Sequence, residues 1–287
     1  MARRLLIVLA IAGLLSTAAC ADSGPTPRVE KPHGAFSSYV AIGDSNTAGP
    51  GIRPVDPGSG LCARSKRNYP ALLAEELKIS SVRDVSCTAA RTDDITKMRP
   101  ITSQVPGAML DAVTPDTDLV TVSMGANDGG AWTGILVFCL LEKYGAEGCS
   151  AFIDTKLDAI LRRTTKRLAS ALNRIEAKAP RARVVLVGYL PIFPQDGGCV
   201  MADLDPARVA PARAGLLAIE RTFKKAAKRA DVEFVSLAKR GAGHQSCDGD
   251  RAWVTGIKTV DGVGMGLHPN AAGMRAVAKF LAAYLTK

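Results

Sequence analysis

The sequence predicts an α/β fold in which helices cover both faces of a parallel sheet. Short apolar runs rich in β-branched residues alternate along the chain with longer segments of helical periodicity. The apolar runs are nearly continuous in hydrophobicity, as in strands that are buried on both faces. Because such alternation is typical of parallel sheets with helical connections, we expect one domain from residue 37 to residue 287.

Five segments are the expected strands. The first, Tyr39–Ile42, ends at a Gly-Asp-Ser turn, and the third, Leu119–Met124, ends at Gly-Ala-Asn-Asp. Val184–Val187 is the fourth strand and Val232–Leu237 the fifth, and a weaker second strand is expected near Val82–Cys87. Sites in such sheets form at the carboxyl ends of the strands, so the loops after these segments are the candidates for function.

Three segments between and after the strands carry apolar residues at helical spacing. The apolar faces lie between residues 157 and 175, between residues 216 and 227, and between residues 274 and 285. Pro206 marks the region where the second of these helices is expected to begin.

The N-terminus predicts export. Residues 1–19 combine a short basic start with an apolar run that is too short to span a bilayer, which is the layout of a signal peptide. Either cleavage follows the small residues Thr17-Ala18-Ala19, or Cys20 becomes a lipidated first residue. We favour the lipoprotein, anchored to the cell membrane and facing the outside or the periplasm, although Thr17 replaces the usual leucine. Residues 20–36 then form a flexible tether.

Cysteine and charge usage exclude several classes of function. Apart from Cys20 there are six cysteines, and an even number in an exported chain predicts three disulfides. No pair has CxxC spacing and the three histidines stand far apart, so no metal is expected. The net charge of +10 falls to +8 without Arg3 and Arg4. The basic residues are scattered and aromatic residues are few, which indicates a solvated surface and no nucleic-acid partner. We expect a monomer.

Three residues at expected strand ends or before the last helix can carry chemistry. Ser45 follows the first strand, Asn127 follows the third, and His268 lies in Gly-Leu-His-Pro-Asn before the last helix. A hydroxyl, an amide donor and an imidazole can supply a nucleophile, an oxyanion donor and a general base. The alternative for His268 is an incidental residue at a helix start that Asn270 caps.

With these motifs, Gly43-Asp44-Ser45, Gly125-Ala126-Asn127-Asp128 and His268-Pro269, the sequence resembles the SGNH hydrolases, also called GDSL esterases and lipases. The resemblance implies a three-layer α/β/α sandwich around a flavodoxin-like, five-stranded parallel sheet. It also implies that Ser45 attacks an ester carbonyl, that His268 takes its proton, and that the Ser45 N–H and Asn127 line the oxyanion hole. No cofactor is implied.

The chain departs from the family pattern at two positions. Ala89 stands where the family has a glycine whose N–H completes the oxyanion hole, and it keeps that donor without strain only if φ is negative. Met265 stands where most relatives have the triad aspartate, three residues before the histidine. By resemblance to actinobacterial secreted esterases with a Ser–His dyad, the Met265 carbonyl is expected to orient His268. The alternative acids are Asp261, Asp248 and Asp250.

The same resemblance implies the disulfide pairing Cys62–Cys87, Cys139–Cys149 and Cys199–Cys247. The expected function is therefore a carboxylic-ester hydrolase that acts through an acyl-enzyme on an acyl lipid or an acylated envelope glycan. Two alternatives remain open at this point. One is acyl transfer, with a sugar hydroxyl in place of water. The other is a non-catalytic, envelope-binding lipoprotein on a hydrolase scaffold, which Ala89 and Met265 motivate.

Overall fold

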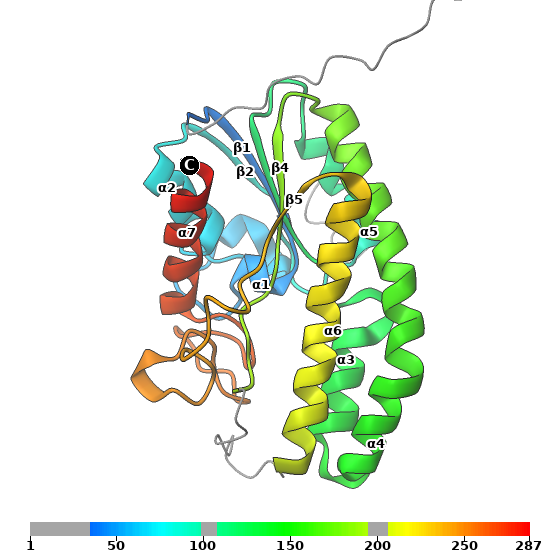
Figure 1. The fold of residues 1–287 in the computed structure, drawn as a ribbon. Helices are drawn as coiled ribbons and strands as arrows, with labels where there is room; N and C mark the ends of the chain where they lie inside the picture. The colour runs from blue at the N-terminus through cyan, green and yellow to red at the C-terminus, as the bar shows by residue number, and fades with distance from the viewer. Residues whose placement is uncertain (1–34, 99–107, 195–205) are drawn as a thin grey trace, which may run out of the picture.

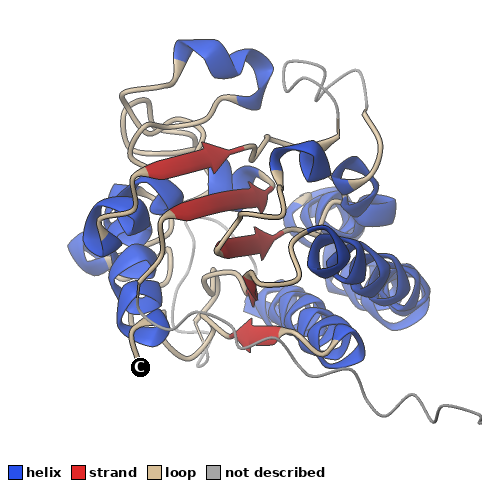
Figure 2. Cartoon of the chain, turned by 90° about the horizontal axis from the view of Figure 1, so that it is seen from above, coloured by secondary structure: helices blue, strands red, loops and turns tan. Residues whose placement is uncertain are grey.

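A five-stranded, all-parallel sheet forms the centre of the protein in the computed structural model, which describes residues 35–98, 108–194 and 206–287. The strand order is β2-β1-β3-β4-β5, which confirms the predicted fold class. Figure 2 shows the strands as the middle layer, with helices on either side. The strands are, in chain order, β1 Ser38–Gly43, β2 Ser81–Asp84, β3 Leu119–Ser123, β4 Arg183–Val187 and β5 Glu233–Val235.

Two pairs of helices cover the sheet. Helices α2 (Tyr69–Leu77) and α7 (Ala271–Leu285) pack against each other on one face. Helices α5 (Asp158–Lys178) and α6 (Pro206–Ala230) pack against each other on the opposite face, as Figure 1 shows. The shorter helices are α1 Ser45–Ala48, α3 Ala131–Ile135 and α4 Gly145–Ala151.

The helical segments between residues 131 and 157 were not predicted from apolar periodicity. There α3 and α4 alternate with two π-helical turns, Leu136–Leu140 and Phe152–Leu157, and a 3-10 turn, Glu142–Tyr144. Gly134, Gly145 and Gly148 interrupt the pattern that a continuous helix would show. Further 3-10 turns are Pro57–Cys62, Thr92–Ile95, Met109–Ala112, Asp128–Gly130 and Gly249–Arg251.

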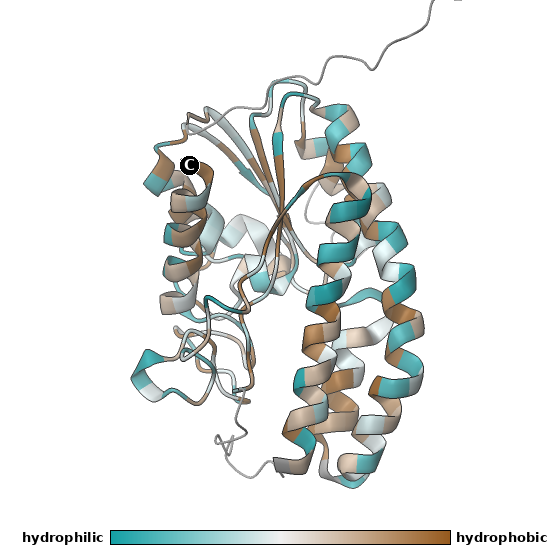
Figure 3. Cartoon of the chain, in the orientation of Figure 1, coloured by the Kyte–Doolittle hydropathy of each residue, from teal (hydrophilic) through white to brown (hydrophobic). Residues whose placement is uncertain are grey.

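The core follows from the apolar strands. Every residue of β3 and β4 is buried, including Arg183, and Figure 3 shows the apolar strands between helices whose outer sides are partly hydrophilic. The guanidinium of Arg183 forms a bidentate pair with Glu233, at 2.7 and 2.9 Å, and donates to the Leu285 carbonyl at 2.8 Å. One buried charge therefore links β4, β5 and the end of α7 without being left unpaired.

The topology brings the chemistry-bearing loops to one edge. Because all strands are parallel, the segments after β1, β3 and β4 meet at their carboxyl ends. Gly43 ends β1, and a Cβ atom at this position would lie 2.1 Å from the Thr47 hydroxyl oxygen. Only a glycine lets the chain turn so tightly from β1 into α1, which places Ser45 at the carboxyl end of the sheet.

Candidate active site

Ser45 is the first residue of α1, directly after the turn that ends β1. The carboxylate of Asp44 accepts a hydrogen bond from the Asn46 N–H at 2.9 Å and so caps the helix. Among the described residues no acceptor is recorded for the Ser45 N–H. Capping at Asn46 therefore leaves the N–H of the serine available for a ligand.

His268 lies against this serine although 223 positions separate them. Its Nε2 atom is 2.8 Å from the Ser45 Oγ atom, and both side chains are buried. The Trp132 ring meets the imidazole edge-on, with ring centroids 5.8 Å apart. Asn270 caps α7 by accepting a hydrogen bond from the Gly273 N–H at 2.9 Å. His268 is therefore not an incidental residue at the helix start, because its imidazole contacts Ser45.

The carbonyl that faces His268 Nδ1 belongs to Gly266, at 2.7 Å, and not to Met265 as expected from the sequence. The Met265 carbonyl instead accepts from the Thr255 hydroxyl and, at 3.2 Å, from the His268 N–H. The reason is local: Leu267 has a left-handed φ of 60°, and this turn folds the Gly266 carbonyl under the ring. A neutral His268 with its proton on Nδ1 therefore presents Nε2 to Ser45 as an acceptor.

None of the three alternative acids contacts the imidazole. Asp261 pairs with Arg53 at 2.8 Å on the surface, and Asp248 accepts from the Gln245 N–H at 2.6 Å. Asp250 is exposed in the turn Gly249–Arg251. In the part of the chain that the structure describes, the only recorded partner of Nδ1 is a main-chain oxygen.

Asn127 and Ala89 lie in neighbouring loops. The Asn127 amide donates to the Ala90 carbonyl at 3.0 Å, which fixes the side chain and leaves its second N–H for another acceptor. Ala89 has a φ of 61°, the left-handed conformation that favours glycine. Its N–H is thus held in a glycine-type geometry at a steric cost of about 1–2 kcal/mol.

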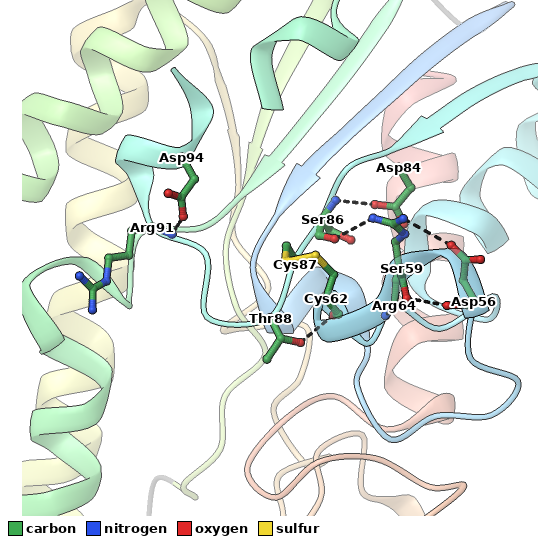
Figure 4. The surroundings of a disulfide bond; sticks show 10 residues. All are labelled: Asp56, Ser59, Cys62, Arg64, Asp84, Ser86, Cys87, Thr88, Arg91 and Asp94. Atoms are coloured by element: carbon green, nitrogen blue, oxygen red, sulfur yellow. Dashed lines mark hydrogen bonds and ion pairs between the residues drawn. A yellow bond between two sulfur atoms is a disulfide. The ribbon is translucent and has the colours of Figure 1, made fainter. Parts of the chain in front are cut away.

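A disulfide anchors the loop that carries Ala89. Cys62 and Cys87 are bonded, and the Thr88 hydroxyl donates to the Cys62 carbonyl at 2.8 Å, as Figure 4 shows. The Cys87 N–H also donates to the Gly43 carbonyl at 3.0 Å. The turn before Ser45 and the loop that contains Ala89 are therefore joined directly.

The second expected disulfide, Cys139–Cys149, is also present. The third was expected between Cys199 and Cys247. Cys247 is disulfide-bonded, and Cys199 lies outside the described residues. Cys20, the expected lipidation site, and the segments 1–19 and 21–34 lie outside them as well.

Burial sets the electrostatics of the site. The pKa of His268 is lowered from its ordinary 6.5 by desolvation, which the hydrogen bond to the Gly266 carbonyl partly opposes. Desolvation also raises the pKa of Asp44 to about 7, while hydrogen bonds from Tyr189 and Asn46 act in the opposite direction. An imidazole that stays neutral near pH 7 is suited to accept a proton from a serine.

Tyr189 and Asp44 form a contact that sequence reasoning missed. The Tyr189 hydroxyl donates to the second carboxylate oxygen of Asp44, next to Ser45. Tyr189 follows Gly188 immediately after β4, so the strand-end rule would have selected it. Tyr189 also borders a cavity of about 50 Å³, which Asn46 and Trp132 line as well.

The described ranges hold neither a cluster of metal ligands nor a helix that could span a membrane. They contain no group of three or more His, Cys, Asp or Glu residues that could hold a metal ion. No helix within them has the length and apolar character that crossing a membrane requires.

Comparison with known proteins identifies relatives over most of the chain. Residues 41–276 match the model of the GDSL-like lipase/acylhydrolase family. Lipase 2 of Streptomyces coelicolor is 32% identical over 92% of this chain and 88% of its own. A lipase of Streptomyces rimosus is 30% identical, with 91% of each chain covered.

Two solved structures share the fold. Phospholipase A1 from Streptomyces albidoflavus NA297 superposes with a TM-score of 0.70 and 28% identity, covering 88% of this chain and all of that one. The extracellular lipase from Streptomyces rimosus superposes with a TM-score of 0.71 and 26% identity, covering 86% of this chain and 99% of that one.

Proposed function

The chain belongs to the GDSL-like lipase/acylhydrolase family and is an ester hydrolase, and from this premise we propose that a Ser45–His268 dyad carries the reaction. The observation that carries the proposal is the 2.8 Å contact between His268 Nε2 and Ser45 Oγ. His268 removes the serine proton while Oγ attacks the ester carbonyl, and the carbonyl oxygen becomes negative.

Hydrogen-bond donors from three strand ends stabilise that oxyanion in the proposed mechanism. They are the N–H of Ser45, the N–H of Ala89 and the side-chain amide of Asn127. His268, then protonated, gives its proton to the leaving alcohol, and an acyl-serine remains. Water, deprotonated by His268, attacks this ester, and the acid leaves with Ser45 restored.

The dyad differs from a triad in what supports the imidazole. The Gly266 carbonyl fixes the tautomer, because it accepts the proton on Nδ1 at 2.7 Å. It carries only a partial negative charge, so it stabilises the imidazolium less than a carboxylate would. The oxyanion donors must then supply more of the transition-state stabilisation.

The proposed substrate is an acyl lipid of the cell envelope. Three apolar residues on the loop before His268 are half exposed: Ile257, Val260 and Val263. Without residues 1–19 the chain carries a net charge of +8, and together with this charge the three residues suit an anionic lipid layer better than a glycan. The names of the relatives, lipase and phospholipase A1, point to the same class. Acyl transfer and a non-catalytic binding role receive no support from these similarities.

Export is consistent with the disulfides, which persist in oxidising compartments. We further propose that the mature protein is a monomeric lipoprotein, with residues 1–19 removed and Cys20 lipidated. Replacement of Cys20 by alanine should move the protein from the membrane fraction to the soluble fraction. An unmodified Cys20 at the start of soluble wild-type protein would contradict the anchor.

The decisive experiment for the enzymatic proposal compares wild type with Ser45→Ala on p-nitrophenyl esters of increasing chain length. We expect turnover by the wild type and at least a thousandfold loss in the variant. Mass spectrometry of protein treated with a fluorophosphonate should place the adduct on Ser45. Labelling elsewhere, with full activity of Ser45→Ala, would disprove the dyad.

A further inference from the structure

A cavity beside the dyad is bordered by neighbours of both of its members. Asn46 follows Ser45, and Trp132 contacts the His268 ring. The cavity extends along α6 and is closed on its other side by the segment that follows β4. The apolar residues of its wall include Leu190, Ile192, Phe193, Leu216, Ile219 and Phe223. The cavity therefore lies next to the dyad, although neither Ser45 nor His268 lines it.

The cavity has a volume of about 50 Å³ and is partly open to solvent, so it admits an acyl chain without fixing the length of that chain.

One carboxyl group interrupts the apolar wall. Glu220 lies on α6, and its Oε1 atom is buried without a hydrogen-bond partner among the described residues. The carboxyl group lies against the chain at Gly188, where a Cβ atom would be 2.5 Å from Oε2 and 3.1 Å from Oε1. The Ser236 hydroxyl and the Tyr189 N–H favour the charged form, while burial raises the pKa of Glu220.

An unpartnered acceptor in an apolar cavity is unfavourable, and a donor on a bound ligand removes the penalty. Arg213 lines the same cavity, so its charge disfavours a cationic group as the donor. Arg213 stands seven residues before Glu220 on α6, about 10 Å along the helix. A neutral hydroxyl group can donate a hydrogen bond to Glu220 and is not repelled by Arg213.

We propose that this cavity is the acyl subsite and that Glu220 accepts a hydrogen bond from a hydroxyl on the acyl chain, which makes hydroxyacyl esters the preferred substrates. The proposal rests on the proposed function of Ser45 and His268. It adds a residue that selects the substrate and takes no part in bond making or breaking.

The test uses matched pairs of p-nitrophenyl esters, butanoate against 3-hydroxybutanoate and hexanoate against 3-hydroxyhexanoate. The measured quantity is the ratio of kcat/KM within each pair, after correction for uncatalysed hydrolysis. We expect wild type to favour the hydroxy ester at least tenfold in one pair. Glu220→Leu should lower that ratio at least tenfold, and Glu220→Gln, which keeps an acceptor oxygen, should retain most of it.

The ratio separates recognition from damage to the fold, because a misplaced α6 lowers kcat/KM for both esters of a pair. Glu76→Leu, the same change on the exposed side of α2, is the matched control and should leave the ratio unchanged. Equal ratios in wild type and Glu220→Leu, with both esters hydrolysed, would overturn the subsite alone. Failure of wild type on every ester would instead overturn the proposed function.

Discussion

The Nδ1 atom of His268 lies 2.7 Å from the carbonyl oxygen of Gly266, two residues earlier in the chain. The segment that presents the imidazole to Ser45 thus also supplies the group that orients it. Such an arrangement needs no second loop to deliver a carboxylate. It depends instead on the backbone path from residue 265 to residue 268.

Substitutions at two adjacent positions should separate backbone from side-chain effects. In Gly266→Ala the new Cβ atom would lie 2.1 Å from the Ile257 carbonyl oxygen, so the backbone must shift. We expect this variant to lose at least a hundredfold in kcat, because the imidazole is turned away from Ser45. Met265→Ala should stay within about tenfold of wild type, a change of about 1.4 kcal/mol or less. Both are measured on a p-nitrophenyl ester. Equal losses in the two variants would contradict the assignment.

The acid limb of the pH profile should lie below the ordinary histidine value. His268 acts as a base only when it is neutral, and burial lowers its pKa from 6.5. As the pH rises through this lowered pKa, kcat/KM should rise, with its midpoint below 6.5. A pH series of kcat/KM tests this. If the midpoint of the kcat/KM profile lies above pH 7 in both wild type and Asp44→Asn, the lowered pKa of His268 is wrong. Such a midpoint would indicate a carboxylate other than Asp44 beside the ring.

Asp44→Asn should stabilise the protein in a pH-dependent manner. The folded-state pKa of Asp44 is about 7, above its ordinary 3.8, because burial disfavours the charge. The folded state therefore loses stability as the pH rises from about 4 through 7. Asparagine keeps the cap on the Asn46 N–H and carries no charge. The gain in Tm over wild type should be small at pH 5 and larger at pH 8.5. An identical difference at both values would show that Asp44 titrates normally.

Ala89→Gly should stabilise the fold because φ at this position is 61°. Relief of about 1–2 kcal/mol of steric cost outweighs the added chain entropy of glycine, which leaves a gain of about 0.5–1 kcal/mol. Urea unfolding measures the difference. Ala90→Gly is the matched control, because Ala90 is buried and is not among the residues with positive φ. This variant should be less stable than wild type. If Ala89→Gly does not raise the free energy of unfolding, the loop relaxes around Ala89 and the steric cost is absent.

Much of the site was predictable because strand ends select residues. Ser45, Asn127 and Tyr189 all follow strands whose parallel order brings them together, and the first two were identified from the sequence. The apolar runs also predicted all five strands, including β2, whose Ser81, Val82 and Arg83 are exposed. Alternation and strand-end position are local signals, so they are read from the sequence directly.

The rest depended on backbone angles and on distant partners. Whether residue 265 or residue 266 faces the imidazole is decided by the φ of Leu267, which composition does not reveal. The bond between Tyr189 and Asp44 joins positions 145 residues apart, with no motif at either end that implies the other. Glu220 gave no signal, since one glutamate on an amphipathic helix resembles a solvated residue.

Phe36 and Ser45 stand at opposite ends of β1, a strand of six residues and about 20 Å. A lipid on Cys20 would therefore hold the domain by the edge that faces away from the dyad. The fourteen residues 21–34 reach at most about 50 Å. With such an anchor, esters in a layer opposite the anchoring bilayer would meet the dyad directly, whereas esters in the same bilayer would be reached only after the domain turns over. A lipid on Cys20 would thus rank substrates by the surface that holds them, before any contact with the cavity.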